Sequence, residues 1–396
     1  MTHAKRALWT ISAGFLIAAA AACSSLDATG LDDGTERTPG GSKSDGGFAN
    51  EPSGEATGGA PTATGVIVVH SATFPSFRLC FENHPNLLPQ PDSKVMPEAN
   101  VVGVEVGSLV RLDPLEAPGK IYVVNERAVR SAAGDPTGLT CGELLGDGTQ
   151  ALLPDNDYHV ATLVGRPLGL TEPLGRDRVQ VLAITGCGSK AFINRFNVDE
   201  ASCGPTWNTT SGNLVANIIN LPTSPAGATK SSIPVQLVHL APMLEAEVGT
   251  ANLEVTFGDL AASGPLPTVV ATNTALLASS EQVTLNVDQN DESIYGTHGF
   301  RIEAREGNGA PKFSFSQSLA AVQSRSSPRD VPTTYYTTAS NYALLLLGDP
   351  SVPATVDGGA PNPDRRRVQL LAVPVLDPTT VDAGVDSGAV NTEDGG

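Results

Sequence analysis

Short segments in which apolar residues run together or alternate with polar ones recur along most of the chain. Strict alternation marks the segments 253–257, 283–287 and 300–304. Further apolar segments, separated by clusters of Gly, Pro and Asp, cover 65–71, 101–106, 120–125, 158–165 and 178–186. A period of two is typical of half-buried β-strands. The pattern predicts an all-β protein made of antiparallel β-sandwiches, with short helices at most at 141–153 and 272–282.

Two parts of this β region resemble each other. GVIVVHSATFPSFRLCFE, from Gly65, is echoed by IPVQLVHLAPMLEAEVGTANLEVTF, from Ile233, and each places a histidine after two apolar residues. Farther on, YHVATLVGRPLGL with RVQVLAITG is echoed by YALLLLGDPSVPA with RVQLLAVPV. The offset between the echoes drifts slowly, as loop insertions in a duplicated domain would produce. We predict two tandem Ig-like domains at 64–222 and 232–376, with a linker at 223–231.

Both ends of the chain lack the apolar side chains that a core needs. Residues 24–63 are rich in Gly, Ser, Thr, Pro and acidic residues, and their large apolar side chains are only Leu26, Leu31 and Phe48. The segment 377–396 contains five acidic residues and no basic one. Such compositions are typical of disorder. We therefore expect a disordered tether at 23–63 and a disordered acidic tail at 377–396.

The first 22 residues have the form of a secretory signal peptide, with a basic stub before the apolar stretch 7–22. Small residues directly precede Cys23, and this arrangement resembles a bacterial lipobox, which implies cleavage at that point and acylation of the thiol. Ser24 is similar to the residue found in the outer-membrane class. We expect a lipid anchor in the outer membrane, on its periplasmic or surface side. The same alanines also fit the A-x-A rule for ordinary secretion, which would release a soluble protein.

The cysteine count agrees with a lipid anchor. Acylation of Cys23 leaves an even set of four, namely Cys80, Cys141, Cys187 and Cys203. Three connectivities are open. We favour Cys80 with Cys141 and Cys187 with Cys203, because each pair joins neighbours along the chain. Four reduced, buried thiols are the alternative in an exported protein, and the absence of a C-x-x-C pair in the sequence gives no reason to expect a metal site.

The charge balance restricts the partners. The chain has 24 Lys plus Arg against 42 Asp plus Glu, for a formal net charge of -18. A chain this acidic is poorly suited to nucleic acid or to anionic lipid surfaces. The membrane is therefore expected as a partner only through the lipid anchor.

The two echoes carry a family resemblance. A strand that ends in V-x-x-V-H, at His70 and at His239, precedes a short loop with small residues, and a Tyr-containing strand follows later. This pattern resembles a β-sandwich domain family of unknown function that is found in bacterial cell-surface lipoproteins, often as tandem copies. The proline of the loop is Pro242 in the second copy, whereas the first copy has Thr73 there and its proline at Pro75. The resemblance implies no catalytic residues.

Few residues are candidates for a site. A lone histidine on a strand is usually a packing residue, and we expect that of His70 and His239. Trp207, Tyr335 and Tyr336 are the candidates for ligand binding, because glycan sites use exposed aromatic rings. For Trp207, which closely follows Cys203 and Pro205, we favour the alternative that it packs against a disulfide. The catalytic and cofactor motifs that we sought are missing from the sequence, among them G-x-S-x-G, H-E-x-x-H and the P-loop.

We therefore predict a non-catalytic binding or structural module of the cell envelope. It has no cofactor, and its partner is an envelope protein or a glycan. A glycan-binding adhesin is the first alternative. An extracellular hydrolase with a site assembled from dispersed residues is the second.

Overall fold

The computed structural model describes residues 65–375 except 75, 92–102, 134–137, 147–150, 164, 166–168, 177, 196–197, 222–228, 230, 249–252, 289–290, 292, 306–309, 327–340 and 357–361. The expected signal peptide, tether and acidic tail lie outside the described residues. All described residues belong to one compact unit, Gly46–Gly396. No helix in this described part is long and apolar enough to cross a membrane.

The described chain is mostly β, as predicted. The N-terminal half contains β1 (Gly65–Ala72), β2 (Phe77–Phe81), β3 (Leu109–Leu112), β4 (Ile121–Asn125), β5 (Tyr158–Leu163), β6 (Val179–Gly186) and β7 (Val215–Asn220). The C-terminal half contains β8 (Ser232–His239), β9 (Leu253–Asp259), β10 (Thr268–Thr272), β11 (Val283–Asn286), β12 (His298–Arg305), β13 (Pro311–Ser318), β14 (Asn341–Leu347) and β15 (Gln369–Val375). The division into two domains near residues 222–232 stays a prediction.

The helices are short. They are α1 (Glu126–Ala133), α2 (Cys141–Leu145), α3 (Lys190–Asn194), the 3-10 helix η1 (Glu200–Cys203), α4 (Pro242–Val248), α5 (Ile294–Thr297) and α6 (Leu319–Ser326). A capping box starts α2: the Thr140 hydroxyl accepts from the Glu143 N–H, and the Glu143 carboxylate accepts from the Thr140 N–H. The other helix considered, at 272–282, is wrong, because Asn273 and Leu277 have positive φ angles that a helix does not allow.

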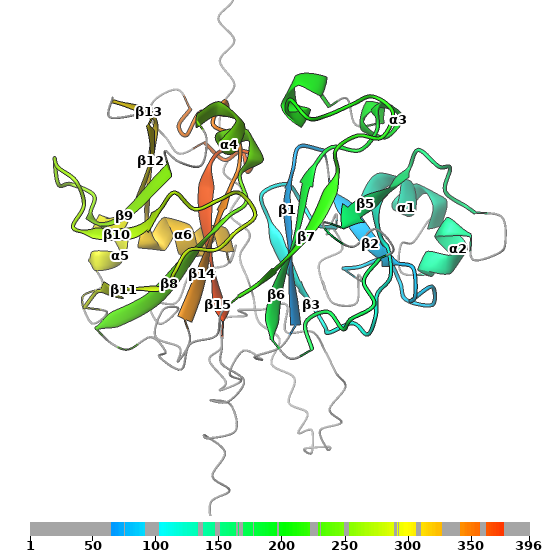
Figure 1. Ribbon diagram of the computed structural model, residues 1–396, viewed down its shortest axis with the longest axis horizontal. Coiled ribbons are helices and arrows are strands. Elements are labelled where there is room, and N and C mark those ends of the chain that lie inside the picture. The colour runs from blue at the N-terminus through cyan, green and yellow to red at the C-terminus, as the bar shows by residue number, and fades with distance from the viewer. Residues whose placement is uncertain are drawn as a thin grey trace, which may run out of the picture. The chain divides into compact units, whose positions relative to one another are not determined.

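Each half has an inner sheet with the same pairing pattern. In the N-terminal half, β1 and β6 are parallel neighbours, flanked by antiparallel β3 and β7. In the C-terminal half, β8 and β14 are parallel neighbours, flanked by antiparallel β11 and β15. The outer layers are β2-β4-β5, which continues from β7, and β10-β9-β12-β13. Figure 1 shows the two inner sheets side by side in the middle of the molecule.

The expectation of antiparallel sheets is wrong for three pairs: β1 with β6, β8 with β14, and β5 with β7. Strands that are buried on both faces read as continuous apolar runs, and parallel pairs are typical of that position. β1 is buried at all but one residue and β14 at every residue. These strands lie between two layers, so their sequences do not alternate.

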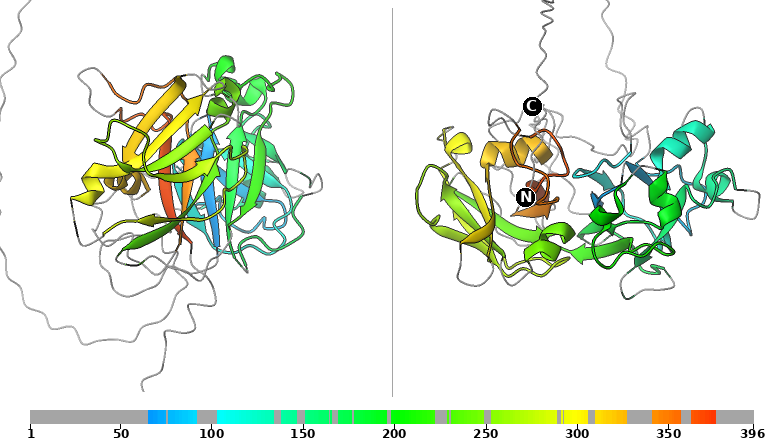
Figure 2. Two further views of the ribbon diagram at one scale, coloured as in Figure 1. Left: turned by 60° about the vertical axis from the view of Figure 1, so that its left-hand side comes forward. Right: turned by 90° about the horizontal axis from the view of Figure 1, so that it is seen from above.

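Three large hydrophobic cores follow from this layering. Val66 and Val68 of β1 enter the core of the N-terminal half, and Leu344 and Leu346 of β14 enter that of the C-terminal half. The intervening residues enter a third core, the central core, between the two inner sheets. It includes Ile67, Val69, Val181, Ala183, Ile219, Val238, Leu240, Ala343, Leu345, Leu347, Leu371 and Val373. The inner sheets therefore pack face to face, as the views in Figure 2 also show.

Polar contacts join the halves at the edge of the central core. Gln369 of β15 donates from Nε2 to the carbonyl oxygen of Gly107 at 3.1 Å, and Arg365 pairs with Glu105 at 2.7 Å. Gly107 has a φ of 63°, and a Cβ there would lie 2.1 Å from the Arg365 carbonyl oxygen. Only glycine allows this approach without strain.

Both disulfides lie in the N-terminal half. Cys80 of β2 bonds Cys141 at the start of α2, and Cys187 after β6 bonds Cys203 at the end of η1. This is the connectivity that the spacing favours. The first bridge lies within a small separate hydrophobic cluster that also contains Val129 and Leu144.

In its last part, the sequence echo aligns strands that do not occupy the same position in the two inner sheets. It aligns Tyr158 of β5 with Tyr342 of β14, and Arg178 before β6 with Arg367 before β15. By position in the inner sheets, however, β14 corresponds to β6 and β15 to β7. Apolar strands of similar composition follow one another here, and composition alone does not fix which strand matches which.

Candidate functional site

A cavity of about 360 Å³ lies in the N-terminal half, between β6, β7 and residues 170–176 and 178. Its apolar lining includes Leu163, Leu170 and Ile218, which also belong to the core of this half or pack against it. The volume is within the range of small-molecule sites in proteins. We call this space the β6–β7 cavity.

Main-chain hydrogen bonds fix the wall of the cavity opposite the strands. Leu170 and Gly119 exchange two of them at 2.8 and 2.9 Å, and Leu174 and Leu115 exchange two more at 2.7 and 2.9 Å. The Gly65 N–H donates to the Gly175 carbonyl at 2.7 Å, beside the start of β1. Main-chain hydrogen bonds to Leu115, Gly119 and Gly65 thus hold this wall in place.

A pair of amide side chains lines the cavity at the ends of β6 and β7. Gln180 accepts at Oε1 from the Gly175 N–H at 2.6 Å and donates from Nε2 to Asn220 Oδ1 at 2.7 Å. These bonds fix both amides, and each side-chain oxygen accepts one of them. Within the described residues, the Asn220 amide nitrogen has no acceptor, so it can donate to a ligand.

Two arginines add positive charge to the lining. Arg176 forms an ion pair with Glu116 at 2.8 Å, and both side chains are mostly exposed. No carboxylate of the described residues pairs with Arg178, which is exposed and lines the cavity. Glu172 contributes one carboxylate to the lining. The Arg178 guanidinium and the Asn220 amide nitrogen are therefore donors that a ligand can use.

His70 and His239 occupy packing positions. His70 is buried against the rings of Phe74 and Phe77, with centroids 5.1 and 4.6 Å away, and its Nδ1 accepts from the Ala72 N–H at 3.2 Å. It also borders a cleft of about 60 Å³ between the halves, which is small for a ligand site.

His239 is buried too. Its Nδ1 lies 3.0 Å from the Thr274 carbonyl oxygen, to which it donates, and burial lowers its pKa. Neither histidine lines the β6–β7 cavity. In the described part of the chain, no three His, Cys, Asp or Glu side chains come together as a metal site would need.

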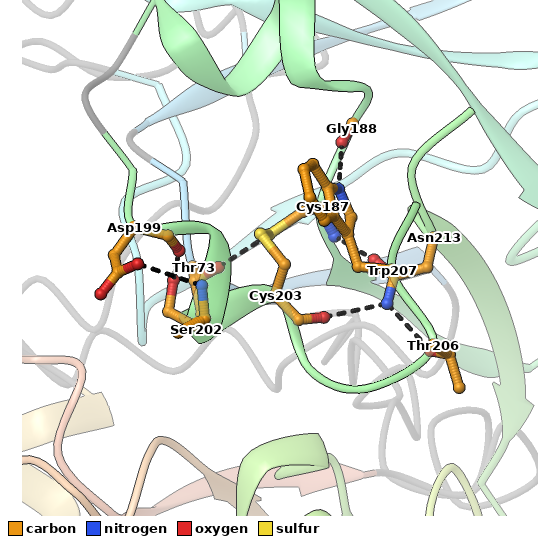
Figure 3. Close-up of a disulfide and its surroundings, with 10 residues drawn as sticks. Thr73, Cys187, Gly188, Asp199, Ser202, Cys203, Thr206, Trp207 and Asn213 are labelled. Atoms are coloured by element: carbon orange, nitrogen blue, oxygen red, sulfur yellow. Dashed lines mark hydrogen bonds between the residues drawn. A yellow bond between two sulfur atoms is a disulfide. The ribbon is translucent and has the colours of Figure 1, made fainter. Parts of the chain in front are cut away.

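Trp207 lies beside the Cys187–Cys203 disulfide, as Figure 3 shows. Its indole Nε1 donates to the Gly188 carbonyl at 2.8 Å, and the side chain packs against the core of the N-terminal half. Asn213 braces the same loop, because its Oδ1 accepts from the Cys187 N–H and its Nδ2 donates to the Cys203 carbonyl. The indole N–H is thus already used inside the loop.

The remaining sequence candidates, Cys23, Tyr335 and Tyr336, lie outside the described residues. The lining of the β6–β7 cavity was not identified from the sequence. Arg178 and Gln180 flank Val179 at the start of an apolar strand, which is the ordinary pattern of a solvent-facing strand end. The signal that could have found them is the run GRDRVQ, with two arginines directly before a strand.

Comparison with known proteins adds no assignment for this site. No family model matches the sequence, and no curated protein is found to be similar to it.

Proposed function

We propose that this protein is a lipid-anchored module of the cell envelope that binds a small polar molecule in the β6–β7 cavity and does not transform it. The observation that carries the binding role is the cavity itself, with a wall fixed by main-chain hydrogen bonds and with two donors, the Asn220 amide nitrogen and the Arg178 guanidinium, that lack a partner among the described residues. Small-molecule sites have this form: an apolar floor and a few fixed polar groups.

The location rests on the sequence. The signal peptide over 1–22 and the small residues before Cys23 support acylation of that cysteine and attachment to the outer membrane. Bacterial acylation that leaves more than one chain on the cysteine gives durable attachment. The tether over 23–63 then sets how far the folded part reaches from the membrane.

The domain arrangement belongs to the same proposal. The shared pairing pattern of the inner sheets supports two tandem Ig-like sandwiches, at 64–222 and 232–376, that arose by duplication. The binding cavity then lies in the first copy, and the second copy serves as a structural partner across the central core.

Two measurements test the proposal. Intact mass spectrometry of native protein from the membrane fraction is expected to give the mass of the acylated chain from Cys23, and an unmodified thiol at Cys23 would remove the anchor. For binding, ligand-observed NMR of the mature chain against a set of sugars, organic acids and amines is expected to detect a ligand.

The matched variants are Ile218→Trp and Val160→Trp. Ile218 lines the cavity, whereas Val160 is an exposed residue of β5 that does not. The first substitution fills the cavity and is expected to abolish the signal, and the second is expected to retain it. Equal signals from both variants would refute binding in the cavity.

A further inference from the structure

The β6–β7 cavity has an uneven set of hydrogen-bonding groups. The side-chain oxygens of Gln180 and Asn220 each accept one hydrogen bond, from the Gly175 N–H and from the Gln180 amide. The Asn220 amide nitrogen and the Arg178 guanidinium are the donors without a partner in the described chain. A ligand that satisfies these groups must present acceptor oxygens.

The charge of the lining selects among acceptors. Arg176 is already paired with Glu116, at 2.8 Å. Arg178 is therefore the one cation of the described lining that lacks a counter-ion. A guanidinium binds a carboxylate through two parallel hydrogen bonds. A single negative charge matches this lining better than the double charge of a phosphate monoester.

The rest of the lining suits a hydroxylated ring. Ile218 is partly exposed and offers apolar surface to C–H groups, whereas Leu163 and Leu170 are buried residues at the edge of the cavity. The Asn220 amide nitrogen lies on the polar side, where it can donate to a hydroxyl oxygen. A cavity of about 360 Å³ has room for a sugar ring and its substituents.

We infer that the β6–β7 cavity binds a sugar acid, with the carboxylate of the ligand on Arg178 and its ring on the apolar floor. This inference rests on the proposed function, because it names the class of ligand for the same cavity. The chain as a whole is strongly acidic, with a net charge of -18, so long-range attraction does not bring this ligand to the protein. Local pairing with Arg178 is the source of the affinity.

The test is calorimetric titration of the mature chain with D-glucuronate, D-glucose and glucose 6-phosphate. Glucuronate is expected to bind, glucose to bind at least tenfold more weakly, and the phosphate to bind more weakly than glucuronate. Arg178→Gln is expected to weaken glucuronate binding at least tenfold and to leave the weak glucose binding unchanged.

Arg127→Gln is the matched control, because Arg127 is an exposed arginine of α1 that has no carboxylate partner among the described residues and does not line the cavity. It is expected to bind glucuronate as the wild type does. Equal binding of glucose and glucuronate, or equal loss in both arginine variants, would overturn the inference while the proposed function stands. If the whole ligand set also fails against the wild type, the proposed function fails as well.

Discussion

The Ser71 hydroxyl donates a hydrogen bond to the main-chain carbonyl oxygen of Leu240, 169 residues farther along the chain. Each of these residues directly follows a histidine, His70 or His239, at the end of the first strand of its half. Matching ends of β1 and β8 therefore meet across the central core. This is the arrangement of an isologous interface, in which like surfaces face each other, here within one chain.

The central core is expected to couple the unfolding of the two halves. Leu345 of β14 is fully buried there, and Leu345→Ala is expected to cost about 2–5 kcal/mol of unfolding free energy, because the cavity is not refilled. Calorimetry of the wild type is expected to give one cooperative transition for the folded part. Two well-separated transitions, of which Leu345→Ala shifts neither, would contradict a shared core.

Gly107 is expected to tolerate no side chain. Gly107→Ala places a Cβ 2.1 Å from the Arg365 carbonyl oxygen, at a φ of 63°, so the halves must move apart or the backbone must strain. We expect the free energy of unfolding, measured in urea, to fall by about 1–3 kcal/mol. Gly264→Ala is the control, since nothing lies within 4 Å of its Cβ. Equal stability of the two variants would show that the approach at Gly107 is not tight.

The ion pair between Arg78 and Glu126 is expected to dominate the stability of the β2–α1 region. Its side chains are only 2% and 4% exposed, and Arg130 also pairs with Glu126. Glu126→Gln removes the buried negative charge. It is expected to lower the free energy of unfolding, measured in urea, by about 3–5 kcal/mol.

Glu200→Gln breaks an exposed pair with Lys190 and is the control, with an expected cost below about 1 kcal/mol. A small effect of Glu126→Gln, comparable with that of the control, would mean that the buried arginine finds another partner.

Acidification is expected to weaken the fold through His239. Burial lowers the pKa of His239, so the folded state keeps the ring neutral while the unfolded chain takes up a proton at the ordinary pKa of about 6.5. The unfolded state then binds more protons, and stability falls as the pH drops through that value.

The measurement is urea unfolding at pH 7.5 and at pH 5.5, above the range in which most carboxylates titrate. The decrease in the free energy of unfolding from pH 7.5 to pH 5.5 is expected to be smaller in His239→Gln than in the wild type. An identical loss in His239→Gln and the wild type would count against the role of His239.

The two disulfides are expected to stabilise the N-terminal half unequally. The closed loops span 61 and 16 residues, and the chain-entropy model gives upper values of about 4 and about 3 kcal/mol. Replacing Cys80 and Cys141 by alanine is expected to lower the urea midpoint more than replacing Cys187 and Cys203. The reverse order would show that Trp207 packing, and not loop closure, sets the contribution of the second bridge.

The half-buried strands were predictable from the sequence, and the central ones were only partly so. β12 alternates because Phe300, Ile302 and Ala304 are buried, whereas Arg301 and Glu303 are only partly so. In β9 the sequence alternates too, but Thr256 is buried like its apolar neighbours. The run of leucines in β14 reads as a buried segment, but whether it lies between two layers depends on the other half of the chain. Parallel pairing of β1 with β6 depends on the same layering, which no local pattern contains.

The candidate site was less predictable than the fold. The cysteine spacing indicated the correct disulfides, because neighbours along the chain close the shortest loops. The β6–β7 cavity depends instead on Gly175 meeting Gly65 and on Gln180 meeting Asn220, and both contacts join residues that are distant in sequence. A long-range backbone contact leaves no signal in composition or periodicity.

Because the inner sheets pack face to face, a substitution on one sheet restricts which substitutions the other sheet can accept during evolution. A substitution on the shared face of β6 alters a surface that β14 or β15 must match, so the two halves can change there only in concert. Substitutions in the outer layers are not constrained in this way. The N-terminal half has its disulfides, extra helices and cavity outside the shared face, where new features can arise without disturbing the partner half.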